Sequence, residues 1–116
     1  MNPAEKKSEK TDRPDPAQMF ESVLGCKWSL HVLGQIRSGV HRPSQLRQTA
    51  EGLTEKVLNE RLNKFLRFGV LERTVYPEAP PRVEYTLTPF GEKFSGVLDQ
   101  IADLRSELSD PAEGEP

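Results

Sequence analysis

Side chains that can hydrogen-bond to nucleic acid recur at helical spacing along one stretch of the sequence. Residues 54–68 read TEKVLNERLNKFLRF, and their amide, carboxylate and ammonium groups stand at Lys56, Asn59, Glu60, Asn63 and Lys64. Amide and ammonium groups bond to base edges in the major groove, and ammonium groups also pair with phosphates. We therefore expect these residues to contact double-stranded DNA. The alternative is an ordinary solvated helix face.

Three residues near this set are further candidates for DNA contact. Thr54 precedes the predicted helix, where its hydroxyl can cap the first turn and also donate to a phosphate. Arg42 stands at the start of the preceding helix and is expected to clamp a phosphate, unless it is only an exposed loop charge. Arg82 follows a proline-rich turn and can enter the minor groove or meet a phosphate. Its alternative is an ion pair with Glu78 or Glu84.

The opposite side of residues 54–68 is apolar. Five residues fall there at helical spacing: Val57, Leu58, Leu62, Phe65 and Leu66. The segment is therefore predicted to be a helix that docks on a core. A short helix over residues 44–50 precedes it, and a tight turn that contains Gly52 joins the two. Two helices joined in this way indicate a helix-turn-helix.

A β-hairpin is predicted directly after this helix. Residues 70–76 and 82–87 alternate between apolar and polar side chains and are rich in β-forming residues. Residues 77–81, PEAPP, cannot be helix or central strand because proline lacks an N–H and restricts φ. A helix-turn-helix followed at once by a hairpin is a winged helix.

Helices are also predicted on both sides of the winged helix. Asp15-Pro16 is a typical helix start for a helix over residues 16–24, and a second helix follows over 27–37 with Trp28 in the core. Thr88-Pro89 starts the last helix, whose apolar stripe is longer than so small a domain needs. We expect a homodimer built from the first and last helices, with contacts from Phe20, Val23, Phe94, Val97, Leu98, Ile101 and Leu104.

The expected fold class is mainly α with a small antiparallel β-hairpin: a winged helix-turn-helix with dimerising terminal helices. A single domain over residues 15–108 holds every predicted element, and a chain of 116 residues suits one domain. Residues 1–14 are polar and of mixed charge, and residues 109–116 are acidic and contain proline and glycine. We expect both tails to be disordered.

Charge is unevenly distributed along the chain. The formal net charge is −2, but residues 37–73 carry eight basic and four acidic side chains. Because binding to a polyanion depends on local charge, the negative net charge does not exclude DNA as a partner.

The sequence offers no motif for an enzyme, a cofactor or a metal site. There is no Ser/His/Asp set, glycine-rich phosphate loop or credible pair of catalytic carboxylates, so we expect no catalytic activity. His31 and His41 are too far apart, without other soft ligands, to suggest a metal site. No apolar run approaches the roughly 20 residues that span a membrane. Residues 1–16 do not resemble a secretory signal, and a cytoplasmic protein is expected.

Cys26 is the only cysteine in the chain, which excludes an intrachain disulfide. Its neighbour Lys27 favours the thiolate, so Cys26 is a candidate redox sensor. A lone cysteine among apolar neighbours is more often an inert packing residue. Both interpretations stay open at this point.

Several stretches resemble the HxlR family of bacterial winged-helix transcription regulators. Two of them are GCKWSL at residues 25–30 and LTEKVLNERL at residues 53–62, with a Gly-X-X-Arg spacing at Gly39 to Arg42 between them. The segment VYPEAPPRVEYTLTPFG at residues 75–91 is similar almost throughout to the family's PPRVEY-S/T-LT-x-x-G signature. The similarity covers about residues 19–106.

This resemblance implies a homodimer that dimerises through terminal helices and reads a two-fold operator. The chain departs from the family at two places. Pro43 follows Arg42 where family members usually have phenylalanine, so an aromatic core contact is missing before the third helix. Several members sense oxidants through a cysteine close to the N-terminus, which this chain lacks, so that role does not pass to Cys26 by position.

These observations predict a sequence-specific transcription regulator that binds a two-fold symmetric operator as a homodimer. A small-molecule or redox effector is compatible with this function. The alternative is a winged helix that contacts only other proteins, without specific DNA binding. A steep dependence of DNA affinity on salt concentration would separate the two.

Overall fold

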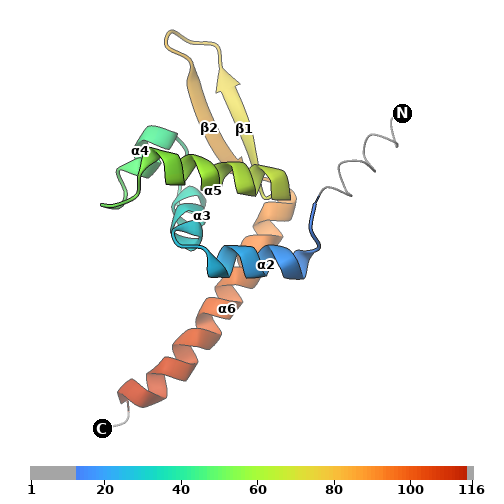
Figure 1. Cartoon of the computed structure of the whole chain (residues 1–116), viewed down its shortest axis with the longest axis vertical. Helices are drawn as coiled ribbons and strands as arrows, with labels where there is room; N and C mark the ends of the chain where they lie inside the picture. The colour runs from blue at the N-terminus through green and yellow to red at the C-terminus, as the bar shows by residue number, and fades with distance from the viewer. Residues whose placement is uncertain (1–12, 115–116) are drawn as a thin grey trace.

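Five helices and one β-hairpin make up the described part of the chain, residues 13–114, in the computed structural model (Figure 1). In chain order they are α2 (Pro16–Gly25), α3 (Ser29–Arg37), α4 (Pro43–Arg47), α5 (Glu55–Phe68), β1 (Leu71–Tyr76), β2 (Arg82–Leu87) and α6 (Pro89–Gly114). The hairpin rises on one side of α5, and α6 extends away on the other side (Figure 1). Most of the predicted N-terminal tail lies outside the described residues. The architecture is the mainly α winged helix-turn-helix that the sequence predicts.

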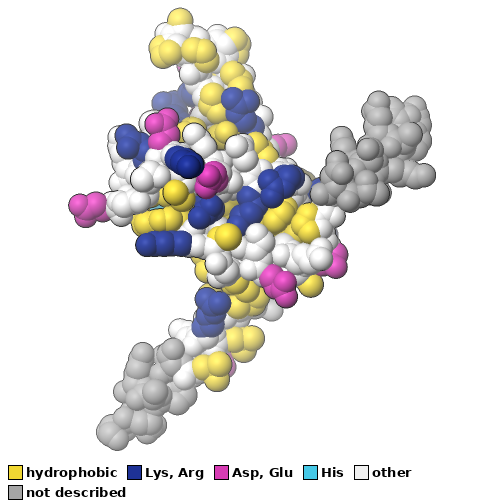
Figure 2. Space-filling model, viewed as in Figure 1, with side chains coloured by type: hydrophobic (Ala, Val, Ile, Leu, Met, Phe, Trp, Pro, Cys, Tyr) yellow, Lys and Arg dark blue, Asp and Glu magenta, His cyan; other side chains and the backbone are white. Residues whose placement is uncertain are grey.

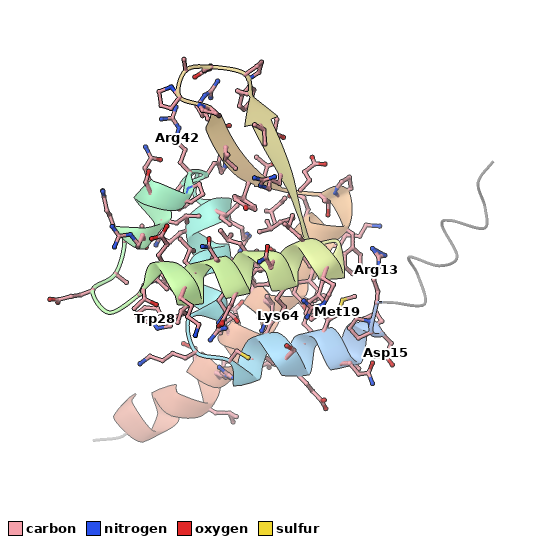
Figure 3. The ribbon with its side chains drawn as sticks, turned by 45° about the horizontal axis from the view of Figure 1, so that its top comes forward. Arg13, Asp15, Met19, Trp28, Arg42 and Lys64 are labelled. Atoms are coloured by element: carbon pink, nitrogen blue, oxygen red, sulfur yellow. The ribbon has the colours of Figure 1, made fainter. Side chains whose placement is uncertain are left out.

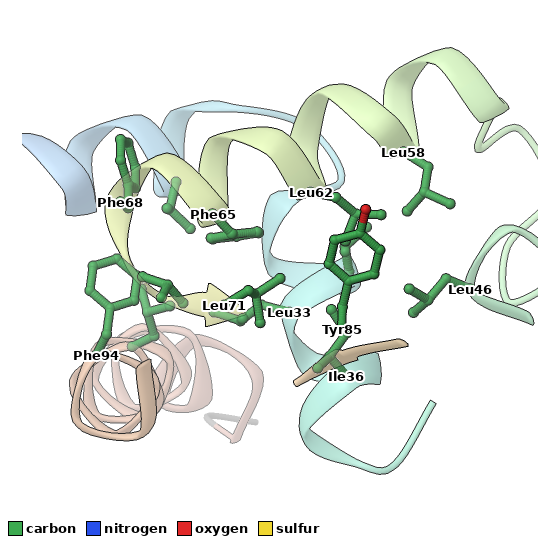
Figure 4. Packing of buried hydrophobic residues seen from close by; sticks show 14 of the residues in the cluster. Leu33, Ile36, Leu46, Leu58, Leu62, Phe65, Phe68, Leu71, Tyr85 and Phe94 are labelled. Carbon is green, nitrogen blue, oxygen red and sulfur yellow. The ribbon is translucent and has the colours of Figure 1, made fainter. Parts of the chain in front are cut away.

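The core lies between α5 and the elements beneath it (Figure 4). Leu58, Leu62 and Phe65 of α5 point toward Leu33 and Ile36 of α3, and all five side chains are buried. Burial of an apolar side chain of this size stabilises a fold by about 1.5–3 kcal/mol. The apolar side predicted for α5 is therefore the side that docks, and its polar side faces away from the core.

Local signals in the sequence set both ends of α5. Thr54 is the N-cap, and its Oγ accepts a hydrogen bond from the N–H of Val57 at 3.1 Å. Gly69 follows the last turn with φ of 78°, a left-handed conformation that glycine adopts without strain because it has no Cβ. The helix begins and ends where the sequence predicts.

The start of α3 differs from the prediction. The helix begins at Ser29 instead of residue 27, because Trp28 has φ of 75° and cannot belong to it. The same turn takes Trp28 out of phase with the buried side of α3. Trp28 is consequently half-buried rather than in the core, with its ring edge-on to His31 at 5.6 Å between centroids.

Two helix ends also differ from the prediction. Helix α4 ends at Arg47 instead of residue 50, because the N–H groups of Gln48 and Thr49 bond to carbonyls only three residues back and tighten the chain into a turn. Helix α6 continues to Gly114, beyond the end expected at Leu108. The apolar stripe from which that end was predicted shows which side of the helix is apolar, not where the helix ends.

The hairpin is antiparallel, with Leu71 opposite Leu87 and Tyr76 opposite Arg82. Tyr85 is 7% exposed and belongs to the core, and its N–H donates to the carbonyl of His41 at 2.9 Å. The base of the hairpin is therefore held by the α3–α4 connection. Its tip, residues 77–81, is exposed.

A compact joint connects the end of α5 to the start of α6. The hydroxyl of Thr88 donates to the carbonyl of Gly69 at 2.6 Å and accepts from the N–H of Gly91 at 2.8 Å. Gly91 is packed so closely that a Cβ there would overlap the carbonyl oxygen of Val70. The joint thereby sets the direction in which α6 leaves the domain.

Along the part of α6 whose side chains are described, up to Leu108, only the first turns are buried. Phe94 and Leu98 are 2% and 6% exposed, and Phe94 stacks on Phe20 of α2 at 4.3 Å between ring centroids. Further along, Leu104 and Leu108 are 60% and 81% exposed. Val97 is also exposed, and Ile101 is half-buried. These residues lie along one side of α6, and we call the set the free stripe: Val97, Ile101, Leu104 and Leu108.

Candidate nucleic-acid interface

One face of α5 consists of exposed polar side chains. Lys56, Asn59, Glu60 and Asn63 lie on it, as expected, and Arg67 continues it by one turn. We call these five residues the α5 polar face. The sequence prediction did not include Arg67. Its spacing of four residues from Asn63 is the signal that identifies it, because such positions share a face of a helix.

Basic side chains are spread over the side of the molecule that carries α5 (Figure 2). Asp and Glu side chains lie between them in smaller number. This distribution agrees with the excess of basic residues in the segment 37–73. Such a surface attracts a phosphate backbone in a manner that depends on salt concentration.

Thr54 and Arg42 stand where α5 and α4 begin. The Thr54 hydroxyl accepts the capping bond and keeps its own proton for donation to another group. The side chain of Arg42 is 47% exposed, and its Nε lies 3.8 Å from the carboxylate of Glu84 (Figure 3). A surface ion pair at this distance is weak, so Arg42 remains able to meet a phosphate.

Arg47 is a second residue that the sequence prediction did not include. It is exposed at the end of α4. It lines a hollow of about 300 Å³ between α4 and α5 together with Glu55 and Asn59. The signal that could have found it is a basic residue in the last turn of the first helix of a helix-turn-helix.

Lys64 does not lie on the α5 polar face. Its side chain is turned toward α2 and is only 8% exposed, and its Nζ donates to the carbonyl oxygen of Ser22 at 3.3 Å (Figure 3). Each residue advances by about 100° around a helix, so Lys64 is rotated from Asn63 into the groove between α5 and α2. The expected DNA contact from Lys64 is replaced by a contact within the chain.

Arg61 makes a similar contact one turn earlier. Its Nε donates to the carbonyl of Lys27 at 2.9 Å, and the guanidinium also lies 3.7 Å from the carboxylate of Glu60. The side chain is 19% exposed. Arg61 and Lys64 therefore connect α5 to the end of α2 and to the turn before α3.

Arg82 is held within the hairpin. Its guanidinium donates to Glu84 at 2.6 Å and to Glu78 at 2.9 Å, and it lies over the ring of Tyr76 at 3.9 Å from the centroid. The hydrogen bond to Glu78, more than that to Glu84, raises the pKa of Arg82 above its ordinary value, so the group stays protonated. The structure shows the ion pair that the sequence left as the alternative to a DNA contact.

Replacing Arg82 with methionine should weaken DNA binding by less than about tenfold, because Glu78 would then lose its partner and Glu84 would keep only Arg42 at 3.8 Å, and the uncompensated negative charge would repel the phosphates of a bound duplex. Adding E78Q and E84Q to that variant should restore the affinity. Fluorescence anisotropy with labelled duplex measures both effects. If the triple variant binds as weakly as R82M alone, Arg82 itself contacts DNA.

The expected dimer residues fall into two groups. Val23, Phe94 and Leu98 are buried in the core of their own chain, and Phe20 packs on Phe94, so these side chains already have partners. This differs from the expectation, because α2 and the first turns of α6 cover each other. Val97, Ile101 and Leu104 belong to the free stripe and face outward at least in part.

Cys26 is the C-cap of α2 and is half-buried. Its N–H donates to the carbonyl of Val23 at 3.5 Å. A redox role for this thiol stays a prediction. Among residues 13–114, no helix is long and apolar enough to cross a membrane, and no three potential metal-binding side chains of His, Cys, Asp or Glu are grouped in this part of the chain.

Comparison with known proteins places this geometry among transcription regulators. The HxlR-like helix-turn-helix family matches residues 23–113. YtfH of Escherichia coli (strain K12), an HTH-type transcriptional regulator by name, is 42% identical over 88 residues, or 76% of this chain and 70% of that protein. A MarR-family regulator from Enterococcus faecalis V583 has a similar structure, with a TM-score of 0.75 at 29% identity over 84% of this chain and 87% of that one. The reduced transcriptional regulator YodB from B. subtilis gives 0.67 at 28% identity over 81% and 88%.

Proposed function

The chain belongs to the HxlR-like helix-turn-helix family, and we propose that it acts by binding a two-fold symmetric operator as a homodimer. It is a DNA-binding transcriptional regulator, as the sequence predicts. The observation that carries the proposal is the α5 polar face, which a helix-turn-helix scaffold holds away from the core beside the basic residues of α4. A helix presented in this way fits the major groove of DNA.

We assign base contacts to Asn59 and Asn63 and a mixed role to Lys56. Amide side chains form paired hydrogen bonds with adenine edges, whereas lysine bonds to guanine or to phosphate. Arg42, Thr54, Arg47 and Arg67 border these residues and are suited to the phosphates on either side. Glu60, in the middle of the face, can accept from cytosine and repels a misplaced phosphate.

The free stripe supports assembly of two copies. Its four apolar residues lie on one side of α6, and the described part of the chain does not cover Leu104 and Leu108. Beside the stripe, α3 and α6 enclose an apolar hollow of about 210 Å³, lined by Leu30, Leu33 and Leu98 among others. Removal of such apolar surface from water stabilises a complex with a partner. A second copy supplies a matching stripe, and a two-fold axis then places two α5 helices for two half-sites about 34 Å apart.

Selection of bound duplexes from genomic fragments tests the proposal directly. Enrichment of a site with two-fold symmetry is the expected result. If the protein is a dimer in solution and yet enriches no DNA, a role in protein–protein contact replaces the proposed function.

Substitution of Lys56 or Asn59 with alanine should weaken binding to the selected site. A true base contact contributes about 1–3 kcal/mol, so each variant is expected to lose roughly five- to 150-fold in affinity. Asn59→Ala should also relax the base preference at one position of each half-site. Titration against the selected site and its single-base variants measures both effects.

Lys93→Ala is the matched control, because Lys93 is an exposed lysine on α6. It should bind as the unmodified protein does. If Lys56→Ala and Asn59→Ala retain full affinity and full base preference, α5 does not read the operator.

A further inference from the structure

Two basic residues of α5 turn away from the α5 polar face and hold the end of another helix. Lys64 Nζ donates to the carbonyl of Ser22, in the last turn of α2, and Arg61 Nε donates to the carbonyl of Lys27 just beyond it. Helix α2 has no basic residue in its own last turn. The two basic side chains that bond to carbonyl groups at its C-terminal end therefore come from α5.

The contact of Lys64 has a physical reason. Carbonyl groups at the C-terminal end of a helix lack partners within the helix and carry partial negative charge. The N–H of Cys26 bonds to Val23, not to Ser22, and leaves the Ser22 carbonyl for Lys64. Lys64 as a whole is only 8% exposed, and its partly buried ammonium group gains from such a partner, because burial of an unpaired charge is costly.

Helix α2 is in turn attached to the helix that carries the free stripe. Phe20 of α2 stacks on Phe94 of α6 with the ring planes 5° apart. Met19 and Val23 of α2 are also fully inside the core. One path of contact therefore runs from the free stripe through α6 and α2 to Lys64, Arg61 and α5, in addition to the direct joint at Thr88 between α5 and α6.

We propose that Lys64 and Arg61 are positioning residues that set the orientation of α5 relative to the dimer axis, and through it the half-site spacing that the dimer accepts. This inference rests on the proposed function, because it requires a dimer that reads two half-sites. In a two-fold dimer, a rotation of α5 against α2 in both protomers moves the two α5 polar faces in opposite directions and changes the distance between them. A dimer with loosened α5 helices accommodates altered spacings that the intact protein rejects.

The test compares the Lys64→Met variant with the unmodified dimer on three duplexes: the selected operator, and the same operator with one base pair inserted or deleted at its centre. Methionine has about the length of the apolar stem of lysine and lacks the charged group. We expect affinity for the selected operator to fall by about tenfold and the discrimination against the altered spacings to shrink by a similar factor. Lys64→Arg should retain both properties because it keeps a donor and a charge.

The salt dependence separates positioning from phosphate contact. In Lys64→Met the slope of log K against log salt should be unchanged, whereas in Lys56→Met, the matched control on the α5 polar face, it should fall by about one. A slope that falls by about one in Lys64→Met overturns the proposal in favour of a DNA contact. Equal loss of affinity on all three duplexes overturns it in favour of a general effect on folding.

Arg61→Met provides a second variant, since its side chain lies nearer the surface and its removal is easier for the fold to tolerate. It should lose discrimination between half-site spacings in the same way, and its slope of log K against log salt should equal that of the unmodified protein. Retention of normal discrimination in Arg61→Met contradicts the proposed role of the pair. If the unmodified protein selects no two-fold site at all, the proposed function fails. Because the selection is carried out before any variant is tested, this failure is distinct from a failure of the present inference.

Discussion

Replacing Leu104 and Leu108 together with glutamate should convert the protein into a folded monomer that no longer holds its operator. Both leucines are exposed in the single chain, at 60% and 81%, so the substitutions leave the core intact. In a two-fold dimer the change introduces four carboxylates into one apolar seam, where unpaired charge is costly to bury. A monomer binds a single half-site and loses the avidity of two linked sites, which amounts to 100-fold or more.

Light scattering after size exclusion measures the mass in solution, and circular dichroism shows whether the monomer is folded. Ser106→Glu is the matched control, because it adds the same charge to the same helix on the side away from the free stripe. It should remain a dimer with normal affinity. A double variant that is still a stable, operator-binding dimer would locate the interface elsewhere.

Leu98→Glu is not a suitable test of the same interface. Leu98 is 6% exposed within its own chain, beside Phe94 and the apolar hollow between α3 and α6. A carboxylate there would be buried in the core and would unfold the protomer itself. Loss of DNA binding by that variant therefore says nothing about dimerisation.

Gly91→Ala should destabilise the domain by about 3 kcal/mol, the upper part of the range for overpacking, although it adds a single methyl group. The new Cβ would overlap the carbonyl oxygen of Val70 and also crowd the Leu87 side chain. Relief requires a shift of α6 against the start of β1, which strains the hydrogen bonds that Thr88 makes to Gly69 and Gly91. For a domain of this size the melting temperature should fall by roughly 15 °C.

Gly96→Ala on the same helix is the control for this prediction. A Cβ at Gly96 meets nothing within 4 Å. Because glycine in a helix interior costs about 0.5–1 kcal/mol relative to alanine, this variant should be slightly more stable than the unmodified protein. Thermal unfolding followed by circular dichroism compares the two. If Gly91→Ala melts at the same temperature as Gly96→Ala, the joint tolerates a side chain and does not set the direction of α6.

The sequence by itself determined the elements and the side of α5 that faces outward. Asp15 and Thr54 cap the helices that they precede, and proline opens α2, α4 and α6. These signals act through hydrogen bonds and dihedral angles within a few residues, so they can be read without the fold. The same holds for Lys56, Asn59 and Asn63, because the 3.6-residue repeat alone places them opposite the apolar side.

Only the tertiary structure decided which partners the side chains at the border between the apolar and polar sides of an element contact. Lys64 and Asn63 are adjacent in sequence and both polar, yet α2 covers Lys64 and leaves Asn63 exposed. Val97 and Leu98 were both expected at the dimer interface, but Leu98 is buried in the core of its own chain while Val97 is exposed. Arg82 meets Glu78 because the turn brings residue 78 back beside β2, whereas Glu84 lies two residues along the same strand. Helical periodicity gives the direction of a side chain around its own axis, whereas its partner depends on where the neighbouring elements pack.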